Sequence, residues 1–502
     1  MDMKLTAKMC IAGLAWMGSM AMAASNFTVS PGNWVVTQEV NGQPGRGMGI
    51  EVRDGTLVMA VYNYAPTGEA TFHLAAGAMN GNSFSGQLME YRGGRYLGGP
   101  ALDAAEVGSA GEVRIDFSSA TTGTIKFPGE PAVDISRYVF DGVPQGRFLP
   151  PGMGEVWLLT KNMDGYFTES SGVAINDADG RMWSDDGECQ VNADTAAVTC
   201  PMTWDSWSSA TVTLKRYGQR VEGTVSRRGS SSKDRVVGAR LALLRFRGDM
   251  ELMFDTESMD WFTGEVTTSS VPEAGLWIIS GENTGKPGRG LTMDLQLDTL
   301  VVQLYGYEAD GSPTFRIGSG KYKGGSSTVA LQKVRGGRYY GSDALTGIDA
   351  GSDGNAQIRF TSPTTGMILL PAEQWVPMQK FSVGVMAPQP ESLLGKWAFF
   401  VAGAGGGREH TVFDLTRVDA GRAKSSSGSA QCWYETTRQG TVRCTDFRGE
   451  YRFTPAYNDG ASMGWAMETG FRNEVIENGN HGRIPVQRVV DRTGVISGSL
   501  PR

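Results

Sequence analysis

The sequence predicts an all-β protein built from four tandem, antiparallel, up-and-down β-barrel modules of about eight strands each, and three observations support this. First, 69 glycines and 21 prolines in 502 residues interrupt the chain too often for long helices. Second, apolar and polar residues alternate with a period of two over most of residues 30–140. Third, residues 32–98 align with residues 275–341 without a gap, at an offset of 243, and 26 of 67 positions are identical.

Eight short runs of strand composition follow one another in the first module. Most are bounded by Gly, Pro, Asn or Asp, which are the residues that end strands and form turns. Such a meander favours closure into a barrel, because closure removes the exposed edges of the sheet. The runs are NWVVTQEV, GMGIEVRD, TLVMAVYNY, EATFHLAA, SFSGQLMEY, GEVRIDF, TGTIKF and VDISRYVF.

The repeat defines the domain organisation. Module A1 spans 30–140 and recurs as A2 at 273–383. The segments that follow each copy also correspond, since GECQVNADTAAVTC at 187–200 resembles SAQCWYETTRQGTVRC at 429–444. We therefore expect an A1, B1, A2, B2 order, with B1 at 153–246, an acidic linker at 247–272 and B2 at 393–492.

The first 23 residues have the pattern of a signal peptide. Lys4 and Lys8 precede a mostly apolar run, and AMA at 21–23 supplies the small residues before a cleavage site near Ala23. The run is too short for a permanent anchor, so we expect no transmembrane segment in the mature chain. A periplasmic or secreted protein is predicted.

The leader contains Cys10, and an even number of cysteines follows it. In an exported chain this favours disulfides over zinc, whose sites need closely spaced cysteines or clustered histidines. Ten and eleven residues separate the members of each pair, so we expect bridges across local hairpins between Cys189 and Cys200 and between Cys432 and Cys444. No metal and no cofactor is predicted.

The net charge of −7, without a basic cluster, argues against a nucleic-acid partner. Hydrolytic motifs such as G-x-S-x-G and H-E-x-x-H are missing from the sequence. The remaining catalytic possibility is an Asp/Glu pair, for which Glu39 with Glu51 and Glu282 with Asp294 are the repeated candidates.

Each module opens with a glycine shortly before a tryptophan and closes with a cation in its last strand. This pattern resembles the calycin superfamily, which includes lipocalins, avidins and small bacterial protease inhibitors. The resemblance implies a small barrel in which the first-strand tryptophan packs under a basic residue from the closing strand. B1 departs from it by one extra residue, and A2 has Lys in place of Arg. The four pairs are Trp34 with Arg137, Trp157 with Arg245, Trp277 with Lys380, and Trp397 with Arg488.

The A modules also resemble a repeat found in exported proteobacterial proteins, which reads G-L-W, E-S-G-x-G and Y-D-x-x-G-x-P-x-W. The matching residues here are GLWIISGENTG and YGYEADGSPTF. Phe72 and Phe315 stand where that repeat has its second tryptophan. Neither resemblance implies specific ligand-binding residues.

The motif E-x-x-G-x-P-G-R-G occurs at 39–47 and again at 282–290. A strand follows it rather than a helix, so it is no phosphate loop of known kind. Pro-Gly fits a type II turn between the first two strands. Glu39 with Arg46 and Glu282 with Arg289 are then expected to form cross-strand ion pairs. The alternative is that the two arginines, which the turn itself does not need, face a ligand.

Tyr62 and Tyr64 share one face of the third strand, as do Tyr305 and Tyr307 in the second copy. Alternating aromatic residues line a ligand site, pack in a core or cover the outside of a barrel. Together with the motif they predict a tentative ligand site, formed by Arg46, Arg289, Tyr62, Tyr64, Tyr305, Tyr307, Glu39 and Glu282.

The main functional hypothesis is an exported, non-enzymatic binding protein for a glycan or a small anionic molecule. The first alternative is an inhibitor-like or structural interaction protein that contacts another protein of the cell envelope. A carboxylate-based hydrolase is the third.

Overall fold

The computed structural model describes residues 29–140 and 272–381 continuously, and most of B1 and B2. The described parts of the B modules are 143, 147–149, 153–163, 166–178, 180–204, 208–217, 220–247, 251–254, 389–402, 408–436, 441–447, 449–453, 455, 462–468 and 482–490. The predicted signal peptide therefore lies outside the described residues, as does most of the predicted linker. In the described parts the protein is all-β, as predicted.

A1 is a closed barrel of eight antiparallel strands in sequence order. Pairing of β1 with β8 closes the barrel and places Trp34 opposite Arg137. Its interior is filled by apolar side chains such as Met48, Ile50 and Leu57 around Trp34. The elements are β1 (Gly32–Val36), the short 3-10 helix η1 (Thr37–Glu39), β2 (Gly47–Arg53), β3 (Thr56–Tyr64), β4 (Ala70–Ala78), β5 (Ser83–Arg92), β6 (Ala105–Phe117), β7 (Thr122–Lys126) and β8 (Ala132–Arg137).

A2 repeats this barrel strand for strand, and β19 pairs with β26 to close it. The predicted eight-strand meander is thus confirmed in both A modules. The elements are β19 (Gly275–Ile279), η2 (Ser280–Glu282), β20 (Gly290–Gln296), β21 (Thr299–Tyr307), β22 (Pro313–Lys323), β23 (Ser326–Arg335), β24 (Ile348–Ser362), β25 (Thr365–Leu369) and β26 (Val376–Lys380).

B2 is also a closed barrel, and its first strand carries Trp397 opposite Arg488 of the last. A disulfide joins Cys432 to Cys444 across neighbouring strands, as predicted. The elements are η3 (Pro390–Leu393), β27 (Gly395–Ala402), β28 (Arg408–Asp419), β29 (Arg422–Ser425), β30 (Gln431–Tyr434), β31 (Val442–Thr445), β32 (Gly449–Phe453), β33 (Ser462–Glu468) and β34 (Gly482–Val490).

B1 differs from the other modules because its strand ladder is not continuous. The sheet begins at β12 and ends at β13, which flank Cys189 in the sequence, and the predicted disulfide from Cys189 to Cys200 lies at this break. The strands are β9 (Met153–Met163), β10 (Tyr166–Ala178), β11 (Arg181–Ser184), β12 (Gly187–Glu188), β13 (Gln190–Val191), β14 (Val198–Thr203), β15 (Ser209–Tyr217), β16 (Arg220–Arg227), β17 (Asp234–Arg247) and β18 (Glu251–Phe254), the last within the predicted linker.

The tryptophan pairs follow the predicted pattern with one correction. In B1 the residue opposite Trp157 is Arg240, whereas Arg245 lies opposite Met153, because the register shifts between Arg240 and Ala242. All four tryptophans are buried. The side chains of Arg245 and Arg488 lie outside the described residues.

The glycine before three of the four tryptophans has a structural reason. Gly32, Gly275 and Gly395 adopt φ angles of 112°, 119° and 118°, which side-chain-bearing residues rarely adopt. A methyl group on Gly32 would also lie 2.8 Å from Arg137 Cζ. The guanidinium of Arg137 donates to Asn33 O at 3.0 Å, so the closing cation does reach a carbonyl of the first strand.

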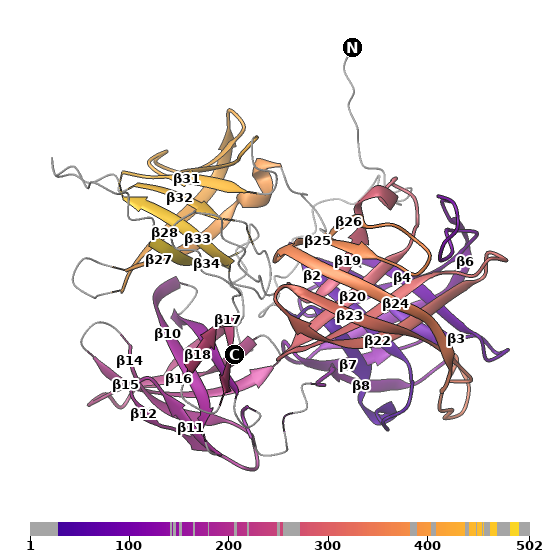
Figure 1. The fold of residues 1–502 in the computed structure, drawn as a ribbon, viewed down its shortest axis with the longest axis horizontal. Helices are drawn as coiled ribbons and strands as arrows, with labels where there is room; N and C mark the ends of the chain where they lie inside the picture. The colour runs from indigo at the N-terminus through magenta and orange to yellow at the C-terminus, as the bar shows by residue number, and fades with distance from the viewer. Residues whose placement is uncertain are drawn as a thin grey trace.

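The two A barrels pack against each other, whereas B1 and B2 form separate lobes (Figure 1). β1 contacts β20, and β19 contacts β2 in the reciprocal manner. Among the described residues, no helix is both long enough and apolar enough to cross a membrane.

Candidate functional site

The predicted motif residues lie at the interface between A1 and A2. Arg46 Nη2 pairs with Glu39 Oε1 at 2.6 Å, and Arg289 Nη2 pairs with Glu282 Oε1 at 2.5 Å. The expected ion pairs are therefore confirmed, but they do not join two strands, because Glu39 and Glu282 end short 3-10 helices and the arginines precede β2 and β20. The type II turn is not formed, because the positive φ falls at Gly42 and Gly285 rather than at Gly45 and Gly288.

Each of these ion pairs belongs to a cluster of four charges shared by both barrels. The first cluster is Glu39, Arg46 and Glu130 of A1 with Arg338 of A2. The second cluster is Glu282, Arg289 and Glu373 of A2 with Arg95 of A1. The two clusters are equivalent, because each A1 residue and its A2 counterpart are 243 residues apart. Arg95 and Arg338 belong to the two RGGRY loops, so the RGGRY loop of each barrel contacts the E-x-x-G-x-P-G-R-G loop of the other barrel.

Both motif arginines are buried and saturated with carboxylate partners. Arg46 Nη1 donates to Glu130 Oε1 at 2.7 Å, and its side chain has no exposed surface. Burial alone would lower the pKa of Arg46, but hydrogen bonds to Glu39 and Glu130 outweigh this effect and raise it. The guanidinium groups are thus occupied by carboxylates, and of the two interpretations offered by the sequence the ion pair is the one observed.

The predicted tyrosines also lie in this interface. Tyr62 and Tyr64 pack edge-on against Phe315 of A2, with ring centroids 5.3 and 5.9 Å apart. Tyr305 and Tyr307 pack reciprocally against Phe72 of A1, at 4.8 and 5.7 Å. Of the interpretations offered by the sequence, covering the outside of a barrel is the one observed, since the four tyrosines belong to clusters shared by A1 and A2 and not to the barrel cores.

The backbone contacts are reciprocal as well. Gly93 N donates to Gly311 O at 2.9 Å, and Gly336 N donates to Gly68 O at 2.7 Å. Likewise Ala104 N donates to Pro287 O and Gly347 N to Pro44 O, each at 2.9 Å. A contact made in both directions by the same surface defines an isologous interface. A1 and A2 therefore form a pseudo-two-fold dimer within one chain.

Glu51 and Asp294, the carboxylates considered for a hydrolytic pair, are buried in the same interface. Glu51 pairs with Lys380 of A2, and Asp294 pairs with Arg137 of A1. Burial raises the pKa of Glu51 despite the neighbouring Lys380. Both carboxylates are at most 1% exposed, so neither lies in a site open to substrate.

A groove of about 420 Å³ runs along one side of this interface. Its A1 wall includes β1 and the loop carrying Gln43, and its A2 wall includes Gln303, Ser319 and Gln332. Tyr138 and Phe140, whose rings lie 5.5 Å apart, form an aromatic part of the lining. This groove was not predicted from the sequence.

Two buried amides in the groove carry atoms without hydrogen-bond partners among the described residues. Asn33 is 1% exposed, and neither its Oδ1 nor its Nδ2 has a partner among the described residues. Gln303 is 9% exposed, and its Oε1 is likewise unpaired within the described part of the chain. Because buried polar groups are normally hydrogen-bonded, these atoms point to a missing partner.

The pseudo-two-fold axis generates an equivalent position on the other side of the interface, where four of the polar groove residues have apolar counterparts. Leu276, Ala60, Ala76 and Met89 stand there in place of Asn33, Gln303, Ser319 and Gln332. Leu276 and Ala60 pack in an apolar cluster with Val58, Leu74 and Phe381, which are the equivalents of other groove residues. Of the four polar residues, Asn33 belongs to A1 and the other three belong to A2, yet all four line the same groove.

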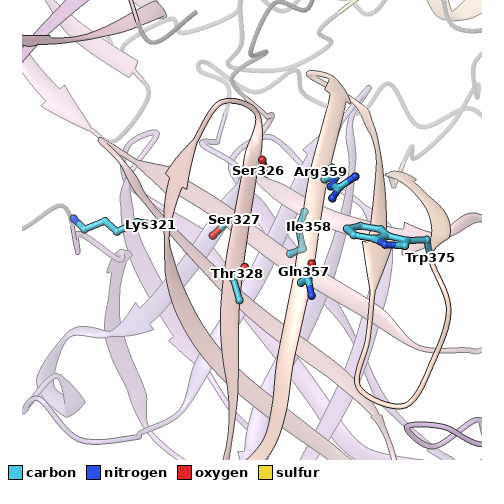
Figure 2. A pocket seen from close by; sticks show the side chains of 8 residues that line it. All are labelled: Lys321, Ser326, Ser327, Thr328, Gln357, Ile358, Arg359 and Trp375. Atoms are coloured by element: carbon cyan, nitrogen blue, oxygen red, sulfur yellow. The ribbon is translucent and has the colours of Figure 1, made fainter. Parts of the chain in front are cut away.

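A second hollow, of about 440 Å³, lies on the outer face of A2 (Figure 2). Arg359 stacks on Trp375, with its Cζ 4.6 Å from the ring centroid, and Lys321 Nζ donates to Asp298 at 2.9 Å. A1 has Asp116 and Ala132 at the positions of Arg359 and Trp375. Lys321, Thr328, Gln357 and Arg359 are exposed to water, and among the described lining residues of this hollow only Ser327 Oγ is buried without a hydrogen-bond partner.

Comparison of the chain with protein-family models, curated proteins and solved structures finds no match. The resemblance to calycins and to the proteobacterial repeat therefore stays a prediction. Among the residues that the structure describes, no group of three or more His, Cys, Asp or Glu side chains is placed to hold a metal ion.

Proposed function

We propose that this is an exported binding protein whose ligand, a neutral polyhydroxylated molecule such as a short glycan, occupies the groove between A1 and A2. The observation that carries the proposal is the convergence of four polar replacements on that groove, two of them buried amides without partners. Stability alone favours apolar residues at these positions, which is what the opposite side has. Polar residues there cost stability and therefore suggest selection for binding.

The chemistry of the lining suits a sugar. A side-chain amide both donates and accepts, so Asn33 and Gln303 match the paired donor and acceptor character of hydroxyl groups. Tyr138 and Phe140 supply apolar surface for the C–H face of a sugar ring. A volume of about 420 Å³ lies within the range of roughly 300–1,000 Å³ typical of small-molecule sites, which often lie between domains.

Charge distinguishes the two ligand classes that the sequence suggested. Of the described lining residues only Glu39 and Arg46 are charged, and they are paired with each other and with Glu130 and Arg338. The groove therefore offers no uncompensated cation to an anion, and a neutral glycan is favoured over a small anionic molecule. Export is supported by the leader pattern and by two disulfides, which persist in oxidising compartments.

The test is calorimetric titration of the full chain with neutral di- and trisaccharides of glucose, galactose and N-acetylglucosamine. The N33L/Q303A/S319A/Q332M variant carries the residues that the repeat uses on its apolar side, so it should fold. It should lose at least tenfold in affinity, or about 1.4 kcal/mol. The control is R359Q in the outer hollow of A2, which should bind like the wild type.

Two results would contradict the proposal. One is wild-type protein that binds none of these saccharides. The other is a quadruple variant that binds as well as the wild type. Binding of an acidic saccharide that R359Q abolishes would instead assign the site to the outer face of A2.

One observation favours the alternative of a protein-docking module. Phe447 in the turn between β31 and β32 is 66% exposed, the largest such value among the large apolar side chains of the described residues. If that turn docks into another protein, Phe447→Ala should weaken capture of an envelope protein that the groove variant still binds.

A further inference from the structure

Equivalent positions of the two repeats meet directly near the pseudo-two-fold axis. Gly49 of A1 and Thr292 of A2 are 243 residues apart, and they face each other. A methyl group added to Gly49 would overlap with Thr292 Oγ1 and lie 2.9 Å from its Cβ and Cγ2. Thr292 is fully buried, and its hydroxyl lies 2.6 Å from Tyr62 Oη. The side chain of Thr292 thus fills the space that the glycine leaves.

This fit exists only when A1 pairs with A2. Near a two-fold axis, a residue in a pair of identical barrels would meet its own copy. Two A2 barrels would press Thr292 against Thr292, and overpacking of a buried contact is destabilising. Two A1 barrels would place Gly49 against Gly49, leaving a void and Tyr62 without its hydroxyl partner.

The buried ion pairs that flank this contact show the same complementarity. Arg137 of A1 pairs with Asp294, and Lys380 of A2 pairs with Glu51, so the longer cation meets the shorter carboxylate and the shorter cation meets the longer carboxylate. Two A1 barrels would oppose Arg137 and Glu51, the longer member of each type. Two A2 barrels would oppose Lys380 and Asp294, the shorter member of each type. Buried ion pairs are stabilising only when their geometry is good.

We infer that Gly49, Thr292 and the two flanking ion pairs form a pairing lock. The lock makes each A barrel fit the other barrel of its own chain and disfavours the equivalent barrel of a second copy. A chain that carries the same pairing surface twice needs such discrimination, because pairing between copies would link chains into dimers or open arrays. This inference is independent of any ligand.

An exchange experiment on the full chain tests the lock. Gly49→Thr should lower the melting temperature of the A-module transition by about 5 °C, because two threonines then collide. Thr292→Gly should lower it by a few degrees. The double variant G49T/T292G exchanges the knob and the hole, and it should recover most of the loss. Gly281→Thr is the matched control, since its position has open space around it.

Several results would overturn the inference. One is Gly49→Thr melting like Gly281→Thr, and another is the double variant being no more stable than Gly49→Thr. If Gly49→Thr fails to fold, recovery of folded protein in the double variant supports the lock, and continued failure contradicts it.

Exchange between chains provides a second readout. Two differently tagged preparations of the full chain are unfolded and refolded together, and co-purification is measured. Wild type should co-purify less than Thr292→Gly, in which identical barrels no longer collide. Equal co-purification of the two proteins would contradict discrimination against a second copy.

Discussion

The pseudo-two-fold axis of the A1–A2 pair relates two charge clusters and two interface grooves, and only the clusters are alike. All four charges of the first cluster recur in the second, with the same partners. The grooves instead differ at many positions, and Asn33, Gln303, Ser319 and Gln332 of one groove have apolar counterparts in the other. Pairing needs the clusters on both sides, which explains why they are identical. The groove is under no such requirement, and it is there that the copies have diverged.

Breaking a cluster should have the largest effect. Arg46→Gln leaves the buried Glu130 and the half-buried Glu39 without their main partner, and loss of one partner from a buried ion pair costs about 3–5 kcal/mol. Arg289→Gln should cost the same within error, because its cluster is equivalent. Urea unfolding monitored by near-UV circular dichroism measures both losses.

Arg359→Gln serves as the control, since this arginine is exposed on the outer face of A2. It should change the unfolding free energy by less than about 0.5 kcal/mol. An Arg46→Gln variant with wild-type stability but without ligand binding would restore the ligand-facing interpretation of the motif.

His73 should make the interface pH-dependent on one side only. It contacts Tyr340 of A2, with Nδ1 3.4 Å from the hydroxyl, and burial lowers the pKa of His73 from 6.5 to about 4. The folded state thus binds fewer protons than the unfolded state between these values, so stability falls as the pH drops from about 6.5 to about 4. The loss should approach 3 kcal/mol.

The equivalent position in A2 is Arg316, which pairs with Asp353 and Glu308 and does not titrate in this range. Comparison with His73→Gln therefore isolates the effect from the carboxylates that titrate in both proteins. Parallel stability profiles of the two proteins between pH 7 and pH 4 would contradict the prediction.

The strands of the A barrels could be predicted because the period of two and the turn residues are local signals. The pairing of the barrels could not, because Arg95, Glu130 and Arg338 show nothing locally that marks them as partners of the motif. The sequence did contain a signal for this interface. RGGRY recurs unchanged, and such a polar segment does not belong in the apolar interior of a barrel. Asn33 and Gln303 could not be predicted as site residues, because they lie in different repeats and come together only when A1 packs against A2. In B1 the prediction of Arg245 as the partner of Trp157 was wrong. A register shift between Arg240 and Ala242 places Arg240 opposite the tryptophan instead.

Asn33→Leu should sharpen the contrast between the two grooves by making the polar side more like the apolar side. Leucine already occupies the equivalent position 276, where it is buried. Removing two unpaired buried polar atoms should raise the unfolding free energy by about 1–3 kcal/mol. Leu276→Asn is the reverse change and should lower stability. A loss of stability in Asn33→Leu would show that the amide has a structural partner, and it would weaken the case for a ligand.

The smallest predicted difference separates Tyr62 from Tyr305, which are equivalent in sequence but not in hydrogen bonding. Tyr62 Oη lies 2.6 Å from Thr292 Oγ1 and also donates to Gln303 O at 3.3 Å, whereas no hydrogen bond of Tyr305 Oη is found within the described part of the chain, and A1 has Gly49 at the position of Thr292. Tyr62→Phe should therefore cost about 1 kcal/mol, the usual net value of one hydrogen bond. Tyr305→Phe should change stability by less than about 0.5 kcal/mol. Chemical denaturation of the two variants side by side measures the difference. Equal effects would mean that Thr292 contributes packing alone, and the pairing of A1 with A2 would then depend on the shape of the glycine–threonine contact rather than on its hydrogen bond.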